Sequence, residues 1–289
     1  MLPDKKIKAI LKQRKLAPKK RFGQNFLVND NISEKIVRLA GIEPDDTIIE
    51  LGVGFGALTG HLARCCKKVI GLEIDSGIVR WHQEEGRLPG NVTLVHQDIL
   101  AADFNMLARE VGGRLKIIAN LPYSISNPLL FKLADHGNRM EWAVLMLQKE
   151  VAQRLSADSG TKEYGILTVR MAASASVHKI LDLGPQHFHP RPKVDSQVIK
   201  IIFHPEPERV KALPDYDLKA FKTIVDAAFQ QRRKTLVNAL SASAQLNLAK
   251  KSIEAALDEM RFDRRIRGEK LSVEDFVALT NILQSYLRS

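Results

Sequence analysis

The tetrapeptide Asn120-Leu121-Pro122-Tyr123 combines two hydrogen-bond acceptors with an aromatic ring. Proline fixes its own φ and drives the preceding residue toward an extended conformation, so the Asn120 side chain and the Leu121 carbonyl should point in fixed directions. Two acceptors beside the flat face of Tyr123 suit a planar base with an exocyclic amine, such as adenine or cytosine. Taken alone, the tetrapeptide also fits an ordinary turn from strand to loop.

A glycine-rich segment, Gly52-Val53-Gly54-Phe55-Gly56, follows the apolar run 47–51 and precedes a helical pattern. Glycines in this position let a ligand approach the backbone at a helix N-terminus. Glu73 follows about twenty residues later, where an acidic side chain can bind ribose hydroxyls. Together with Ala57 the segment also satisfies the dinucleotide pattern, so these features leave NAD and S-adenosylmethionine both open.

Asp98 ends the third predicted strand and favours an adenosyl donor. Its carboxylate can accept from the exocyclic amine of adenine, and Ile99 can pack on the ring. Other polar or glycine residues end the neighbouring strands, namely Glu50, Gly52, Glu73 and Asn120. In an open α/β sheet the carboxyl ends of the strands form the ligand crevice, so these groups should surround one pocket.

Five apolar runs separated by helical stretches predict a doubly wound parallel sheet in an α/β fold. These runs cover 47–51, 68–72, 92–95, 115–119 and 142–147. Two longer runs, 174–183 and 197–203, predict a closing hairpin. Ahead of the first strand, a helical repeat predicts a helix that ends near Gly41, with Asn31 or Ser33 as its N-cap.

The last third of the chain predicts a small all-α domain. Three prolines and the charges between them mark a linker at 204–215. Helical periodicity follows over 218–229, 234–240, 250–260 and 273–287. Ser272, three residues before Asp275, matches a capping box at the start of the last helix.

Composition argues against a membrane protein and against a metal protein. No apolar stretch reaches the roughly 20 residues that a span needs, and no leader with a cleavage site opens the chain, so we expect a cytoplasmic protein. Cys65 and Cys66 are neighbours, which predicts no structural disulfide between them. We interpret His187, His189 and His204 as structural or surface groups, because their spacing matches no metal site.

The formal net charge of +11 predicts a polyanionic partner. Residues 1–21 hold nine Lys or Arg against one acid, so most of the excess lies in a basic N-terminal arm. Candidate contacts to a nucleic-acid backbone are Lys19, Lys20, Arg21, Arg232, Arg233 and Lys234. A solvated tail is the alternative for the arm.

A second basic cluster follows in the helical region. It consists of Arg261, Arg264, Arg265 and Arg267. These arginines are further candidates for backbone contact. The alternative is pairing with the acids of the same region, Asp258, Glu259 and Asp263.

Seven motifs occur in an order that closely resembles the KsgA family of small-subunit ribosomal RNA adenine dimethyltransferases. They are FGQNFL (22–27), ELGVGFG (50–56), EID (73–75), NLPY (120–123), LQKEV (147–151), PKVDS (192–196) and RRKTL (232–236). The resemblance runs from about residue 20 to the C-terminus. It implies a Rossmann-like class I S-adenosylmethionine-dependent methyltransferase fold with a small C-terminal all-α domain.

The resemblance also implies a reaction and a partner. S-adenosylmethionine would be the methyl donor, and the acceptors would be two adjacent adenosines near the 3′ end of 16S rRNA. Each adenosine would be dimethylated at N6 within the 30S subunit, late in small-subunit biogenesis. We expect the chain to act as a monomer.

Site residues carry over from the same motifs. The donor contacts implied are Asn25, Leu27, Gly52, Glu73, Asp98 and Asn120. The acceptor base is assigned to Asn120, Leu121, Pro122 and Tyr123, and Lys149 joins the basic residues expected to contact RNA. The sequence departs from the family pattern at Val53, where proline is usual, and at 124–127, which concerns the rim of the base pocket.

The domains expected from these motifs are the arm (1–21), a methyltransferase domain (22–205) and a helical RNA-contact domain (206–289). The nearest alternative is a 23S rRNA adenine methylase that confers macrolide resistance, against which the RRKTL motif within a full helical domain argues. A ribosome assembly or transcription factor that only binds is disfavoured by the intact donor residues. An NAD oxidoreductase is the remaining alternative.

Overall fold

The computed structural model describes residues 24–86 and 88–287, and these form two compact units. The first unit contains residues up to Ala152 together with Ser176–Pro205, and the second contains Gln153–Ala175 and Glu206–Ser289. The predicted arm, with Lys19, Lys20 and Arg21, lies outside the described residues. Residues 153–175, which were expected in the methyltransferase domain (22–205), belong to the helical unit.

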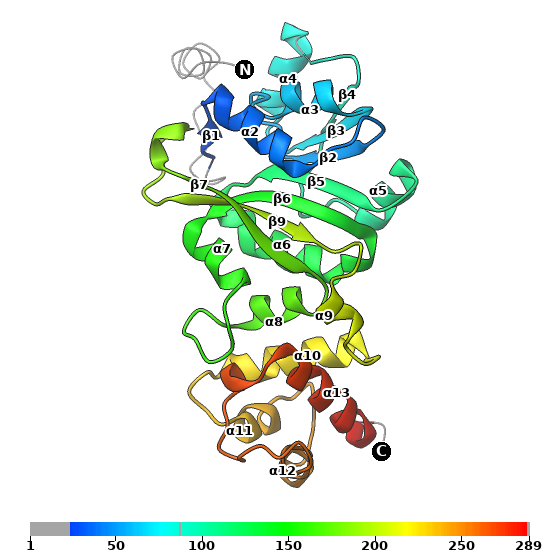
Figure 1. Ribbon diagram of the computed structural model, residues 1–289, viewed down its shortest axis with the longest axis vertical. Coiled ribbons are helices and arrows are strands. Elements are labelled where there is room, and N and C mark those ends of the chain that lie inside the picture. The colour runs from blue at the N-terminus through cyan, green and yellow to red at the C-terminus, as the bar shows by residue number, and fades with distance from the viewer. Residues whose placement is uncertain (1–23, 87, 288–289) are drawn as a thin grey trace. The chain divides into compact units, whose positions relative to one another are not determined.

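A seven-stranded sheet forms the centre of the first unit, in the order β4-β3-β2-β5-β6-β9-β7 (Figure 1). The first five of these strands run parallel, whereas β9 is antiparallel to both β6 and β7. The bounds are β2 (Thr47–Leu51), β3 (Lys68–Glu73), β4 (Val92–His96), β5 (Leu115–Asn120), β6 (Met140–Gln148), β7 (Ser176–Leu183) and β9 (Ser196–Ile202). The predicted parallel sheet and closing hairpin are therefore confirmed.

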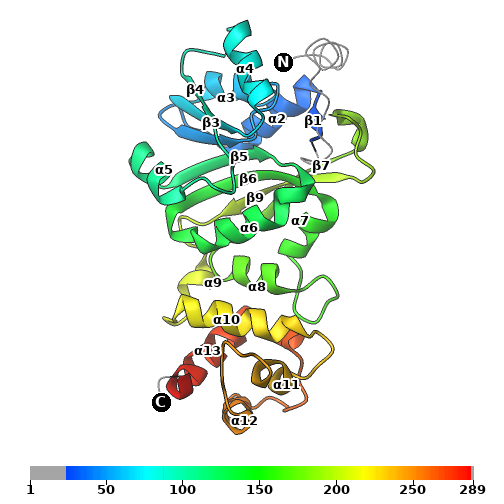
Figure 2. The same cartoon turned by 180° about the vertical axis from the view of Figure 1, so that it is seen from behind.

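Helices cover both faces of this sheet. They are α2 (Asp30–Ala40), α3 (Thr59–Cys65), α4 (Ser76–Glu85), α5 (Phe104–Val111) and α6 (Ser126–Asp135). Ile36 of α2 and Leu62 of α3 share a buried core with Ile48 and Val144 of the sheet. Successive side chains of a strand alternate between faces, so the buried Ile49 points to the opposite face. On that face α6 lies in front of β6 and β9 (Figure 2).

The N-cap of α2 is Asn29, and the expectation of Asn31 or Ser33 is wrong. The Asn29 side chain accepts from Ile32 N at 3.2 Å, which satisfies one of the first free amides of the helix. Ser33 instead donates its hydroxyl to the Asn29 carbonyl from within the first turn. The predicted end is confirmed, because Gly41 takes a left-handed conformation with φ of 72°.

A two-residue ribbon was not predicted. β1 (Phe26–Leu27) pairs antiparallel with β8 (Phe188–His189). Strands this short leave no readable periodicity in a sequence. The pairing fixes the segment ahead of α2 to the first unit.

The second unit is helical. It contains α8 (Ile166–Ala172), α9 (Glu208–Lys211), α10 (Leu218–Gln230), α11 (Leu236–Ser241), α12 (Lys250–Glu259) and α13 (Val273–Leu287), and α7 (Lys149–Leu155) crosses the division between the units. Val169 of α8 joins the core formed by Phe221, Leu257 and Phe276, which explains why residues 153–175 belong here. The predicted linker contains the short α9.

The capping box at the start of α13 is confirmed. Asp275 N donates to the Ser272 hydroxyl at 3.1 Å, and Ser272 N donates to the Asp275 carboxylate at 2.8 Å.

Over the described parts of the chain, the structure shows neither a helix that could cross a membrane nor a group of three metal-binding side chains.

Candidate active site

A pocket opens at the carboxyl ends of β2, β3, β4 and β5, which are neighbours in the sheet. The chain moves outward from β2 to β4 and then returns on the other side of β2 as β5, so the pocket lies at the point where the strand order reverses. Open α/β sheets bind ligands at such a point. The structure brings all six predicted donor contacts to this pocket, namely Asn25, Leu27, Gly52, Glu73, Asp98 and Asn120.

The glycine loop after β2 is shaped by backbone conformation and by close approach. Gly52 and Gly54 have φ of +82° and +55°, which side chains rarely adopt. A Cβ on Gly54 would also lie 3.3 Å from the Phe26 ring. Val53, where the family usually has proline, is buried against β3, because Gly71 leaves room for its side chain.

Two buried side chains hold Gly54 from opposite sides. Its amide donates to Glu73 Oε2 at 2.8 Å, and its carbonyl accepts from His82 Nε2 at 2.8 Å. Burial lowers the pKa of His82, which keeps the imidazole neutral near pH 7 and the proton on Nε2. Burial raises the pKa of Glu73, although the amides of Asp75 and Gly54 oppose this by donating to its carboxylate. The loop is therefore held in place without a ligand.

Glu50 is a buried acid in the wall of the pocket, with 2% of its surface exposed. Burial, with repulsion from Glu73, raises the pKa of Glu50 to about 8. Its Oε2 has no hydrogen-bond partner among the described residues. A pKa of about 8 keeps Glu50 mainly protonated at pH 7 in the empty pocket, and a positively charged ligand beside Oε2 would favour its ionised form.

Asp98 and Ile99 form the side of the pocket beyond β4. Asp98 is exposed and accepts from Leu100 N at 2.8 Å through Oδ1, which fixes the direction of its carboxylate. Ile99 is buried and supplies an apolar wall. A carboxylate beside such a wall suits the edge and face of an adenine ring.

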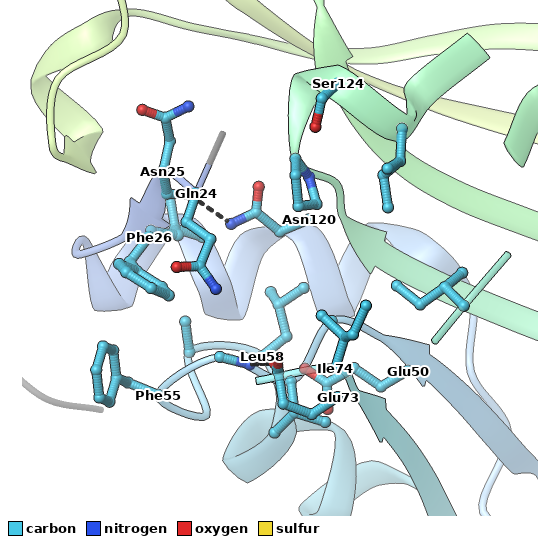
Figure 3. A pocket seen from close by; sticks show the side chains of 18 of the residues that line it. Gln24, Asn25, Phe26, Glu50, Phe55, Leu58, Glu73, Ile74, Asn120 and Ser124 are labelled. Atoms are coloured by element: carbon cyan, nitrogen blue, oxygen red, sulfur yellow. Dashed lines mark hydrogen bonds between the residues drawn. The ribbon is translucent and has the colours of Figure 1, made fainter. Parts of the chain in front are cut away.

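Asn120 lies at the end of β5, and its side-chain amide has a fixed orientation. Nδ2 donates to the backbone carbonyl of Asn25 at 3.1 Å (Figure 3). A carbonyl oxygen only accepts, so the nitrogen must face Asn25, and Oδ1 forms the opposite end of the amide. Pro122 follows with φ of −57° and ψ of 132°, as its ring requires for φ. The extended conformation expected of Leu121 stays a prediction.

Tyr123 is held by the hairpin strand β9. Its hydroxyl lies 2.8 Å from the hydroxyl of Ser196, which is fully buried. The ring is partly buried, and this burial raises the pKa of the phenol. Pro122, Ser124 and Ile125 line the pocket, whereas Tyr123 does not. Tyr123 therefore stands next to the pocket and outside its wall.

The basic residues differ in the contacts that they make. Arg232 donates to the carbonyls of Lys162 and Tyr164 at 3.1 and 2.9 Å. Arg233 and Lys234 are exposed. Arg264 pairs with Asp258 at 2.5 Å and with Glu254 at 3.6 Å, as the alternative for the arginine cluster anticipates. Lys149 is partly buried at the start of α7.

Several residues of this site were missed in the sequence. Phe26 and Phe55 line the pocket with their ring centroids 4.8 Å apart, and Phe55 lies edge-on to Trp81 at 5.3 Å. Both phenylalanines are inside motifs that were used for the resemblance, so a signal existed. Ser196 ends the PKVDS motif, but its contact with Tyr123 lies 73 residues away in the sequence. His82 belongs to none of the seven motifs, and no local pattern points to it.

The parallel order of β2 to β6, the glycine loop and the acidic strand ends define a Rossmann-like methyltransferase. The family model for ribosomal RNA adenine dimethylase matches residues 16–285, and the chain belongs to this family. A relative from Desulfotalea psychrophila, named ribosomal RNA small subunit methyltransferase A, is 50% identical over 281 residues, which cover 95% of this chain and 94% of the relative. The protein of that name from Syntrophus aciditrophicus is 41% identical, over 96% of this chain and 98% of the relative.

Solved structures show the same fold. A dimethyladenosine transferase from Plasmodium falciparum matches with a TM-score of 0.70 and 28% identity, over 88% of this chain and 95% of that one. The 23S rRNA methyltransferase ErmE matches with a TM-score of 0.64 and 23% identity, over 90% and 100%. Together with the family match, these findings confirm the predicted resemblance, fold class, enzyme class and methyl donor. The roles of individual residues stay predictions.

Proposed function

We propose that the chain transfers methyl groups from S-adenosylmethionine to N6 of two adjacent adenosines near the 3′ end of 16S rRNA in the 30S subunit. Each adenosine would be dimethylated during late small-subunit biogenesis. The proposal places the chain in the cytoplasm as a monomer. Relatives named for the small-subunit reaction support this substrate over the 23S alternative.

The residues of the pocket fit the donor. Gly52 and Gly54 leave the backbone open to a ligand, and the Glu73 carboxylate lies beside them. The unpartnered Oε2 of Glu50 suits the positive charge of S-adenosylmethionine, and Asp98 with Ile99 suits its adenine. When bound, the donor supplies an electrophilic methyl group on a cationic sulfur.

The observation that carries the proposal is the orientation of Asn120. Because Nδ2 is used by Asn25, Oδ1 is left as the acceptor at the edge of the donor pocket. The lone pair of adenine N6 is delocalised into the ring, which makes the amine a poor nucleophile. Donation from its two N–H groups to Asn120 Oδ1 and the Leu121 carbonyl would favour a pyramidal nitrogen. Positioning should then supply most of the rate.

The acceptor turn needs no strong base. A methylated aminium is acidic and loses its proton readily, so a neutral acceptor is sufficient. Tyr123 would stack on the base, a contact worth about 1–3 kcal/mol. After the first transfer only one N–H remains, and the pocket must accept a methyl group in place of the other.

RNA recognition is assigned to the basic residues. Arg233 and Lys234 are exposed and suit phosphate contact. Lys149 and the arm residues Lys19, Lys20 and Arg21 complete the proposed contacts. Arg232 is a weaker candidate, because its guanidinium already serves two carbonyls.

The test is methyl transfer from labelled donor to unmethylated 30S particles, followed by mapping of the modified adenosines. Naked 23S rRNA serves as the competing substrate. We expect label on two adjacent adenosines near the 3′ end of 16S rRNA and none above background on 23S rRNA. Preferential labelling of 23S rRNA, or donor binding without transfer to either RNA, would overturn the proposal.

A further inference from the structure

Lys132 of α6 points its ammonium into a ring of backbone carbonyls. Nζ donates to Leu100 O at 2.7 Å, to Ala102 O at 2.5 Å and to Ile99 O at 3.3 Å. An ammonium has three N–H donors, so one lysine satisfies all three carbonyls. No motif or charge pattern in the sequence singles this residue out.

The carbonyls belong to the loop that forms one wall of the donor pocket. Asp98, Ile99 and Leu100 line that pocket. Within the loop, Leu100 N donates to Asp98 Oδ1 at 2.8 Å, Ala101 N to Asp98 O at 3.1 Å and Ala102 N to Ile99 O at a long 3.4 Å. Without a cation between them, three converging carbonyl dipoles would repel one another. Lys132 therefore adds three contacts to the hydrogen bonds that hold this loop.

The helix that carries Lys132 begins at the acceptor turn. The 3-10 turn η2 (Tyr123–Ile125) continues directly into α6 at Ser126. Ser124 and Ile125 line the same pocket as the loop. Lys132 thus connects the acceptor side of the pocket to its adenine side.

The environment of Lys132 supports a fixed cation. The ammonium lies 4.7 Å from the centre of the Phe104 ring, and the side chain is partly buried. Burial lowers the pKa of Lys132, and the charges of Asp98 and Asp103 oppose this effect. The Lys132 ammonium is thereby held in one position near the pocket.

We infer that Lys132 is a positioning residue for the methyl donor, which sets donor affinity by holding the 98–102 loop against the acceptor helix. The inference rests on the proposed function only in taking S-adenosylmethionine as the occupant of the pocket. Lys132 itself does not line the pocket and acts through Ile99 and Leu100.

Lys200 offers a matched control. Its Nζ also donates to a backbone carbonyl, Ala40 O at 2.7 Å, and lies 5.1 Å from the centre of an aromatic ring, that of Trp142. It is partly buried, and burial lowers its pKa too. Lys200 does not line the donor pocket, and neither do Ala40 and Trp142.

The experiment measures the Kd of S-adenosylhomocysteine by calorimetry for the wild type, Lys132→Met, Lys132→Gln and Lys200→Met. Thermal unfolding of each variant is recorded alongside. We expect the Kd to rise about tenfold for Lys132→Met and by less for Lys132→Gln, which keeps two N–H donors. Lys200→Met should lower the Tm without changing the Kd.

A second readout needs no ligand. Amide hydrogen exchange over 98–104 should be faster in Lys132→Met than in the wild type and unchanged in Lys200→Met. Donor affinity in both Lys132 variants within about twofold of the wild type would overturn the inference alone. A wild type that does not bind S-adenosylhomocysteine would overturn the proposed function and this inference together.

Discussion

The hydroxyl groups of Tyr123 and Ser196 lie 2.8 Å apart, and this contact joins the acceptor turn to the closing hairpin. Ser196 is fully buried at the first position of β9. The direction of the Tyr123 ring is thus set by a residue 73 positions further along the chain. The closing hairpin supplies no residue to the pocket and contacts the Asn120–Tyr123 turn instead, where we propose that the acceptor base binds.

Removal of this hydrogen bond should affect the acceptor and spare the donor. Ser196→Ala should lower kcat/KM for 30S particles by up to about tenfold, the scale of one neutral hydrogen bond. The Kd of S-adenosylhomocysteine should stay unchanged. Tyr123→Phe keeps the ring and should give a similar loss, whereas equal activity in both variants and the wild type would show that the contact has no catalytic role.

The packing of the Val53 side chain should require a glycine at position 71. A Cβ on Gly71 would lie 2.5 Å from Val53 Cγ2, so Gly71→Ala should destabilise the protein by about 1–3 kcal/mol. Val53→Ala in the same chain should recover part of this loss, because it removes the clashing methyl group. Denaturant unfolding of the single and double variants measures the coupling. If Gly71→Ala lowered the free energy of unfolding equally in the wild type and in the Val53→Ala variant, the proposed contact would be refuted.

Much of the fold could be predicted because its strands are fully buried. Parallel strands such as β2 and β5 are covered on both faces and form continuous apolar runs, which the sequence displays directly. The N-cap of α2 was placed wrongly, since Asn29, Asn31 and Ser33 are all capping residues within one turn. The ribbon of β1 and β8 was too short to produce a pattern.

The residues that line the pocket were easier to predict from the sequence than the residues that hold the lining segments in place. Strand ends are visible in the sequence, and parallel strands bring their carboxyl ends to one edge. The contacts of His82 with Gly54, Lys132 with the 98–102 loop and Ser196 with Tyr123 span 28 or more residues. Such contacts depend on packing in three dimensions. The place of 153–175 in the helical unit depends on packing in the same way.

Glu50 should make stability depend on pH. Its folded pKa of about 8 is raised above the ordinary value of 4.5, so the folded state holds this proton more tightly than the unfolded state does. The free energy of unfolding should therefore fall as pH rises from about 4.5 to about 8 and change little above that. Glu50→Gln cannot ionise and should be the more stable protein above pH 8, by on the order of a few kcal/mol.

Urea unfolding of the wild type and Glu50→Gln at about pH 5 and about pH 9 tests this. A stability difference between the two proteins that is the same at both pH values would contradict the raised pKa. Donor binding provides a second comparison. The variant should bind S-adenosylmethionine more weakly at high pH, because it lacks the negative charge that the cationic donor favours.

Arg232 should act as a structural residue, whereas Arg233 and Lys234 should contact RNA. Arg233→Ala and Lys234→Ala should each reduce the salt dependence of 30S binding by about one unit of slope. Arg232→Ala should instead destabilise the helical unit by about 1 kcal/mol, because two carbonyls lose a donor. Filter binding at several salt concentrations and urea unfolding distinguish the two effects. A reduced salt slope for Arg232→Ala with unchanged stability would reverse the assignment.

The most direct test of the central claim is the rate of methyl transfer by Asn120→Ala. Single-turnover transfer of labelled methyl to unmethylated 30S particles is compared for the wild type, Asn120→Ala and Asn31→Ala, an exposed asparagine of α2. With donor binding partly retained, Asn120→Ala should transfer about a hundredfold more slowly or worse, and Asn31→Ala should match the wild type. Transfer by Asn120→Ala at a rate near that of the wild type would contradict the assignment of the acceptor base to the Asn120–Tyr123 turn.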